Sequence, residues 1–65
     1  MIAEIDIYRT ANLLIQQHGE EASIHAAMKA DEMLEKGDLD GKAVWMQVVR
    51  AIEKLQATKP EGALH

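Results

Sequence analysis

The chain has 65 residues, no cysteine, and eleven acidic against seven basic side chains, for a formal net charge of -4. This length makes one small domain with a marginal hydrophobic core that no disulfide can support. The negative charge disfavours a general nucleic-acid binder, because phosphate binding depends on clustered Lys and Arg. The acidic N-terminus is unlike a signal peptide, and the longest apolar run, residues 43–46, is far short of the roughly 20 residues of a membrane span. We therefore expect a soluble, cytoplasmic protein.

The first predicted element is a helix near residues 3–18. Its apolar residues recur with helical spacing, and the opposite side of the segment is polar. Gly19 follows as a helix stop, because glycine enters the left-handed region without a steric penalty. The expected inner face consists of Ile7, Tyr8, Ala11, Leu14, Ile15 and His18.

The second predicted helix, near residues 20–36, begins with two glutamates, which the positive end of the helix dipole favours. Its inner face is rich in alanine, the best helix former, and small side chains let a neighbouring helix approach closely. Gly37 is the next helix stop. The expected inner face consists of Ala22, Ala26, Ala27, Ala30, Met33 and Leu34.

The third predicted helix lies near residues 39–57. Asp38 and Asp40 are both plausible N-caps, and Asp40 would also place Leu39 and Val44 as a hydrophobic staple. Pro60 disfavours helical geometry before it, so residues 58–65 are expected to form a frayed tail. The expected inner face consists of Val44, Trp45, Val48, Ala51, Ile52 and Leu55.

Two short connections between three helices predict antiparallel neighbours. The expected fold is therefore all-α, a small antiparallel three-helix bundle formed by one domain over residues 1–57. Its core is expected to surround Trp45 and to contain Ile7, Leu14, Ile15, Leu34, Val48, Ile52 and Leu55.

Few residues are arranged for chemistry. His18 and His25 are separated by a predicted helix break and His65 lies in the tail, whereas zinc needs three or four ligands of defined geometry, so we expect no metal and no cofactor. Asp31 lies at the margin of an inner face, where a carboxylate needs a partner. The candidate donors for a buried polar pairing with Asp31 are Tyr8, Arg9 and Trp45.

Several apolar residues fall outside the predicted inner faces. In a chain with so small a core, such residues suggest either ordinary exposure or an interface, and a homodimer is one form that the interface would take. The candidate interface residues are Ile2, Ile5 and Leu13 on the first helix, and Ile24 and Met28 on the second.

A set of motifs gives the chain a family resemblance. The set comprises residues 17–20 (Gln-His-Gly-Glu), the Ala26-Ala27 pair, residues 37–41 (Gly-Asp-Leu-Asp-Gly), Trp45, and the spacing of Val49, Ile52 and Leu55. It resembles short uncharacterised bacterial proteins that are common in alphaproteobacteria and catalogued as a domain of unknown function. The resemblance spans residues 7–56, and it implies a free-standing cytoplasmic helical protein without assigning any functional residue.

The functional expectation is a small non-enzymatic module for protein interaction or regulation, whose partner is another protein or a second copy. One alternative is a helix-turn-helix-like nucleic-acid binder that uses the third helix, which the charge of -4 disfavours. The other alternative is a small enzyme or ligand-binding protein, which the lack of a catalytic constellation disfavours.

Overall fold

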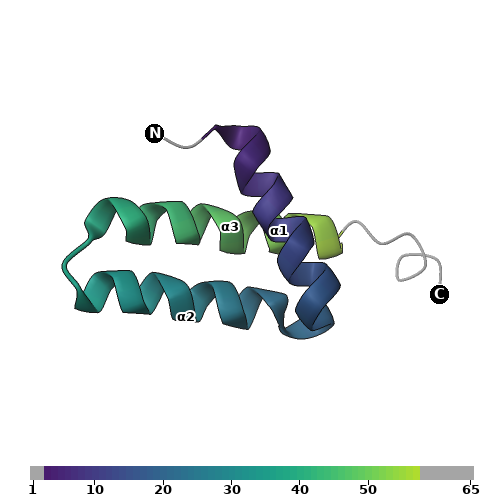
Figure 1. The fold of residues 1–65 in the computed structure, drawn as a ribbon. Coiled ribbons are helices and arrows are strands. Elements are labelled where there is room, and N and C mark those ends of the chain that lie inside the picture. The colour runs from purple at the N-terminus through teal and green to yellow at the C-terminus, as the bar shows by residue number, and fades with distance from the viewer. Residues whose placement is uncertain (1–2, 58–65) are drawn as a thin grey trace.

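The computed structural model describes residues 3–57, and all of them are helical except Ala3 and the short turn at residues 36–38. The elements are α1 (Glu4–His18), the 3-10 turn η1 (Gly19–Glu21), α2 (Ala22–Glu35) and α3 (Leu39–Ala57) (Figure 1). The all-helical expectation is therefore confirmed for this part of the chain. The expected tail at residues 58–65 and the candidate interface residue Ile2 lie outside it.

The path from α1 into α2 bends at Gly19. This residue has φ +59° and ψ -125°, a conformation that side-chain-bearing residues rarely adopt, and its N–H donates to the Ile15 carbonyl. Glu20 and Glu21 stay helical in η1, so residues 4–35 follow one long bent helical path rather than two helices separated by a loop.

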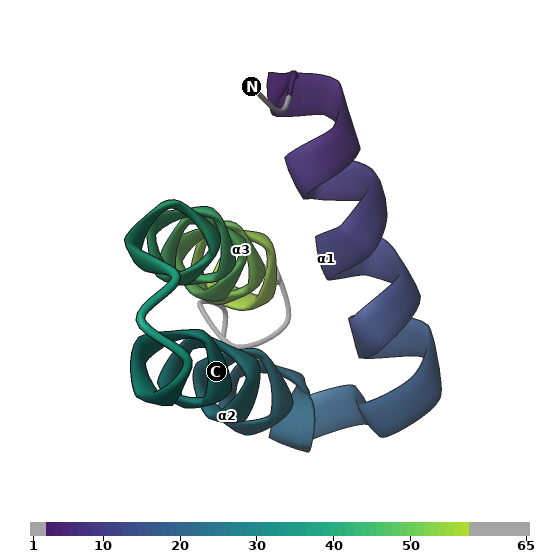
Figure 2. The same ribbon diagram turned by 60° about the vertical axis from the view of Figure 1, so that its left-hand side comes forward.

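The expected antiparallel three-helix bundle is therefore wrong. Only α2 and α3 run antiparallel, side by side, whereas α1 runs steeply across them (Figures 1 and 2). The prediction failed because it took Gly19 as the start of a chain-reversing loop. A single residue with positive φ followed directly by a helical turn changes the direction of the chain without reversing it.

The turn between α2 and α3 joins a helix stop directly to a helix start. At Gly37, φ is +79°, and the Gly37 N–H donates to the Leu34 carbonyl while the Asp38 N–H donates to the Met33 carbonyl at 2.8 Å. This pattern is a Schellman motif, which satisfies carbonyls at the end of α2. With so short a connection, the two helices are held as an antiparallel pair.

Asp38 also caps α3. Its Oδ1 accepts from the Gly41 N–H at 2.8 Å, which satisfies an amide of the first helical turn. Of the two candidate caps, Asp38 therefore has this role and Asp40 lies inside the helix. Gly41 leaves room for the cap, because a Cβ on this residue would lie 2.5 Å from Asp38 Oδ2 and 2.9 Å from Met33 Sδ.

The core lies where α2 and α1 meet α3, and α2 and α3 form the most extensive packing in the molecule. Within residues 3–57, five of its nine buried residues are alanines, and Val48 and Ile52 are its largest fully buried side chains. The buried residues are Ile7, Ala11, Ala22, Ala26, Ala30, Val48, Val49, Ala51 and Ile52.

The expected core is confirmed only in part. Ile7, Val48 and Ile52 are buried, but Trp45 is half-buried at the edge rather than at the centre. Leu34 was expected in the core and is 49% exposed. It belongs to the last turn of α2, directly before the turn that leads into α3. The other expected core residues, half-buried against the core, are Leu14, Ile15 and Leu55.

Within residues 3–57, none of the helices has the length and apolar character needed to cross a lipid bilayer.

The two glycines with positive φ differ in how well they tolerate replacement. At Gly37, alanine should lower the free energy of unfolding by about 1–2 kcal/mol, and asparagine should cost less because it tolerates the left-handed region. At Gly19, alanine should cost about 1–3 kcal/mol and asparagine should not be better, because ψ -125° lies outside that region. Urea denaturation followed by circular dichroism measures all four variants. Equal losses for alanine and asparagine at Gly37 would contradict this conformational explanation.

The alanine face of α2 should not accept larger side chains. Ala26 is fully buried against the core, so Ala26→Leu is expected to force α2 and α3 apart and to cost about 1–3 kcal/mol of stability. The matched control is Ala43→Leu on the exposed side of α3, which should change stability by less than about 0.5 kcal/mol. Thermal and urea unfolding compare the two variants, and a neutral Ala26→Leu would show that the helices are not closely packed there.

Candidate functional site

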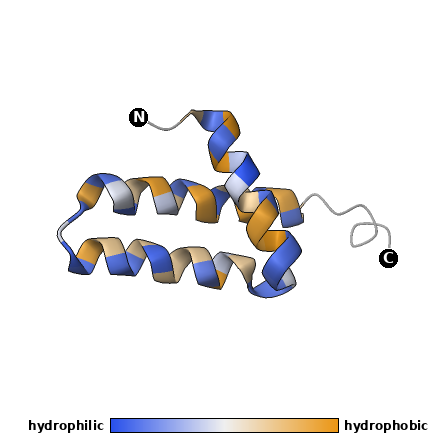
Figure 3. Cartoon of the chain, viewed as in Figure 1, coloured by the Kyte–Doolittle hydropathy of each residue, from blue (hydrophilic) through white to orange (hydrophobic). Residues whose placement is uncertain are grey.

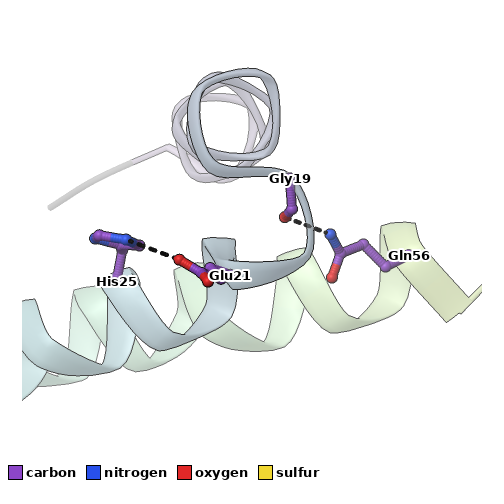
Figure 4. A network of polar contacts seen from close by, with 4 residues as sticks. All are labelled: Gly19, Glu21, His25 and Gln56. Carbon is purple, nitrogen blue, oxygen red and sulfur yellow. Dashed lines mark hydrogen bonds and ion pairs between the residues drawn. The ribbon is translucent and has the colours of Figure 1, made fainter.

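The bend between α1 and α2 brings two histidines together. The rings of His18, in the last turn of α1, and His25, in α2, are stacked, with centroids 3.6 Å apart and planes inclined by 15°. The His25 Nε2 atom lies 4.0 Å from Glu21 Oε1, a contact that Figure 4 shows along α2. The two imidazoles and this carboxylate are the densest group of titratable side chains at the bend.

The sequence did not predict this contact. In a straight helix, residues seven apart are separated by about 10.5 Å along the axis, and the expected break at Gly19 separated His18 from His25 further. The observed bend instead folds the end of α1 over the start of α2. The direction of the bend depends on the backbone angles of His18 and Gly19, which the sequence does not reveal, and it decides whether the rings separate or meet.

The stacked rings are not arranged to bind a metal ion together. The lone pairs of an imidazole lie in the plane of its ring, and zinc binds about 2.0 Å from the nitrogen. Two nearly parallel rings separated by 3.6 Å therefore direct their lone pairs into different planes. In addition, no group of three or more His, Cys, Asp or Glu side chains suited to a metal ion is found within residues 3–57.

One hydrogen bond holds α3 to the same bend. The Gln56 side-chain amide donates to the Gly19 carbonyl at 3.0 Å (Figure 4). The same carbonyl also accepts from the Ala22 N–H at the end of η1, so Gln56 adds a second donor to an oxygen that has two lone pairs. This contact joins residues 37 positions apart and fixes the end of α3 beside the start of α2.

The expected buried pairing of Asp31 is wrong. Asp31 is exposed, and no polar or charged side chain is buried within the described part of the chain. Arg9 is also exposed and lies 3.9 Å from Asp6, while Tyr8 and Trp45 are half-buried on α1 and α3. Asp31 follows the buried Ala30 by one residue, and this rotation of about 100° carries its carboxylate into solvent.

Two hollows lie where α1 crosses α3, one on each side of Ile7. The first has a volume of about 170 Å³ and a mixed lining of charged, polar and apolar residues, made of Glu4, Ile7, Tyr8, Gln47, Arg50, Ala51 and Lys54. The second has a volume of about 200 Å³ and is more apolar, lined by Asp6, Ile7, Thr10, Val44, Trp45 and Val48. Both are smaller than the several hundred Å³ of a typical ligand site.

The outward apolar residues are the most extensive unusual feature of the surface. Four candidate interface residues, Ile5, Leu13, Ile24 and Met28, are more than half exposed. Leu34 and Leu39, which the sequence did not suggest, are exposed beside the α2–α3 turn. Figure 3 shows hydrophobic residues on the side of α1 that faces the viewer as well as along α2 and α3.

No family model, curated protein or solved structure matches the chain. The resemblance to short alphaproteobacterial proteins therefore stays a prediction, and no functional residue is transferred to this chain.

A double-mutant cycle tests the histidine stack. His18→Ala and His25→Ala should show a coupling energy of about 0.5–1.5 kcal/mol, near the lower end because both side chains are only partly buried. A parallel cycle that replaces the neighbouring, exposed Gln17 instead of His18 should show none. Urea denaturation of the variants supplies the energies. Equal coupling in the two cycles would mean that the rings do not stack in solution.

Proposed function

We propose that this chain is a small non-enzymatic interaction module, acting in the cytoplasm, that binds a protein partner through its outward apolar residues. The observation that supports this proposal is the distribution of large apolar side chains. Within residues 3–57, six of them are exposed, whereas four side chains larger than alanine lie in the buried core. A chain so short of core gains most by burying such residues against another molecule.

The alternatives have less support. An enzyme needs convergent catalytic groups, but Asp31 follows His25 by six residues, which places it about 9 Å along α2 and 240° around it. A helix-turn-helix protein would present α3 to DNA, yet α3 supplies Val48, Val49, Ala51 and Ile52 to the core, and the chain carries a net charge of -4.

Substitution of the outward residues should abolish binding without affecting the fold. Wild-type protein is coupled to resin and used to capture proteins from a cell lysate. Each captured protein is identified, purified, and tested again for binding to the wild-type chain. The quadruple variant Ile5→Ser, Leu13→Ser, Ile24→Ser, Met28→Ser should lose any specific partner while changing the free energy of unfolding by no more than about 2 kcal/mol. Sedimentation of the wild type across a concentration series tests whether the partner is a second copy.

The control variant carries Ala43→Ser and Gln47→Ser on the exposed side of α3 and should keep the partner. A partner that binds the quadruple variant as tightly as the wild type would contradict the proposal. A saturable catalytic activity of the purified protein that the quadruple variant retains would also contradict the proposal.

A further inference from the structure

The outer face of α2 has two exposed apolar residues next to each other on the helix. Ile24 and Met28 are one helical turn apart and are 59% and 53% exposed. They follow the buried Ala22 and Ala26 by two residues each, a rotation of about 200°, so they point away from α3. His25, whose ring stacks on His18 of α1, lies beside this face rather than on it.

The border of this face is acidic. Four exposed carboxylates flank Ile24 and Met28, each three, four or seven positions from one of them and therefore on the same side of the helix. They are Glu21, Asp31, Glu32 and Glu35. Lys29 lies 3.8 Å from Glu32 and His25 lies 4.0 Å from Glu21, whereas Asp31 and Glu35 have no ion pair within residues 3–57.

The charge decides what this face can bind. A second copy docked on a twofold axis would place the same four carboxylates against their equivalents, and like charges brought together oppose association. Phosphate-bearing surfaces are repelled for the same reason. A complementary surface has an apolar centre and a border of Lys or Arg.

We propose that the outer face of α2, centred on Ile24 and Met28, binds a basic amphipathic helix. This inference rests on the proposed function and identifies the chemistry of its partner. The partner's apolar residues, spaced three or four apart, contact the two outward side chains, and its Lys or Arg residues approach Asp31 and Glu35. A single helix face is a small interface, so the complex is expected to be weak and sensitive to salt.

The direct test uses two synthetic 14-residue helical peptides with the same leucine stripe, one with lysine and one with glutamate at every other position. Each is titrated into isotope-labelled protein and followed by amide chemical shifts. The lysine peptide should bind with a micromolar Kd, shift the signals of residues 21–35, and weaken at least threefold between 50 and 200 mM salt. The glutamate peptide should not bind.

Variants separate the apolar and the electrostatic contributions. Ile24→Ser with Met28→Ser should weaken lysine-peptide binding at least tenfold, and Asp31→Asn with Glu35→Gln at least threefold with a smaller salt dependence. Ala43→Ser with Gln47→Ser on the exposed side of α3 is the matched control and should bind like the wild type. Circular dichroism establishes that every variant keeps its helix content.

Several results would overturn the inference. They are equal binding of the glutamate peptide, shifts confined to α1 or α3, unchanged binding by the Ile24 and Met28 variant, or a wild-type dimer that this variant converts to monomer. If a partner is lost on substitution of Ile5 and Leu13 but not of Ile24 and Met28, the interaction module stands and this assignment of its surface fails.

Discussion

The close packing of α2 against α3 through Ala22, Ala26 and Ala30 is the interaction on which the rest of the structure depends. Alanine lets two helix backbones approach, but each alanine removes little apolar surface from water. The larger buried side chains, Ile7, Val48, Val49 and Ile52, therefore each remove more apolar surface from water than an alanine does. α1 contributes Ile7 and Ala11 to the core and crosses the α2–α3 pair. A core of this kind is necessarily thin, which leaves large apolar residues outside it.

Short turns make this packing possible. Asp38 takes part in ending α2 through its N–H and in starting α3 through its side chain, so the two helices are joined with no free loop between them. Such a connection limits how far the helices can slide or rotate, and it lowers the entropy lost on folding. At the other end of the hairpin, Gln56 and the Gly19 carbonyl link α3 to the bend, so both ends of the α2–α3 pair are fixed.

The helices could be predicted from the sequence because their signals are local. Apolar spacing, the glycine stops and the acidic cap place α3 at residues 39–57, as observed, and α1 and α2 within about two residues. The crossing of α1 could not be predicted, because it depends on the backbone angles of His18 and Gly19. The same angles determine the stacking of His18 on His25. The exposed candidate residues followed from periodicity, but the exposure of Asp31 and Leu34 depends on where α3 lies against α2.

The two sides of α2 have opposite characters. Its inner side has small neutral residues where larger ones would bury more surface, and its outer side has Ile24 and Met28 where water surrounds them. Exchanging large and small residues between the two sides would place more apolar surface on the inner side, yet larger inner residues would separate α2 from α3. The outward residues thus do not pack into the core, and changing them should leave the fold intact. Folding depends on the inner residues of α2 and the proposed binding on its outer residues, so the acidic apolar face is where the proposed function can be tested independently of stability.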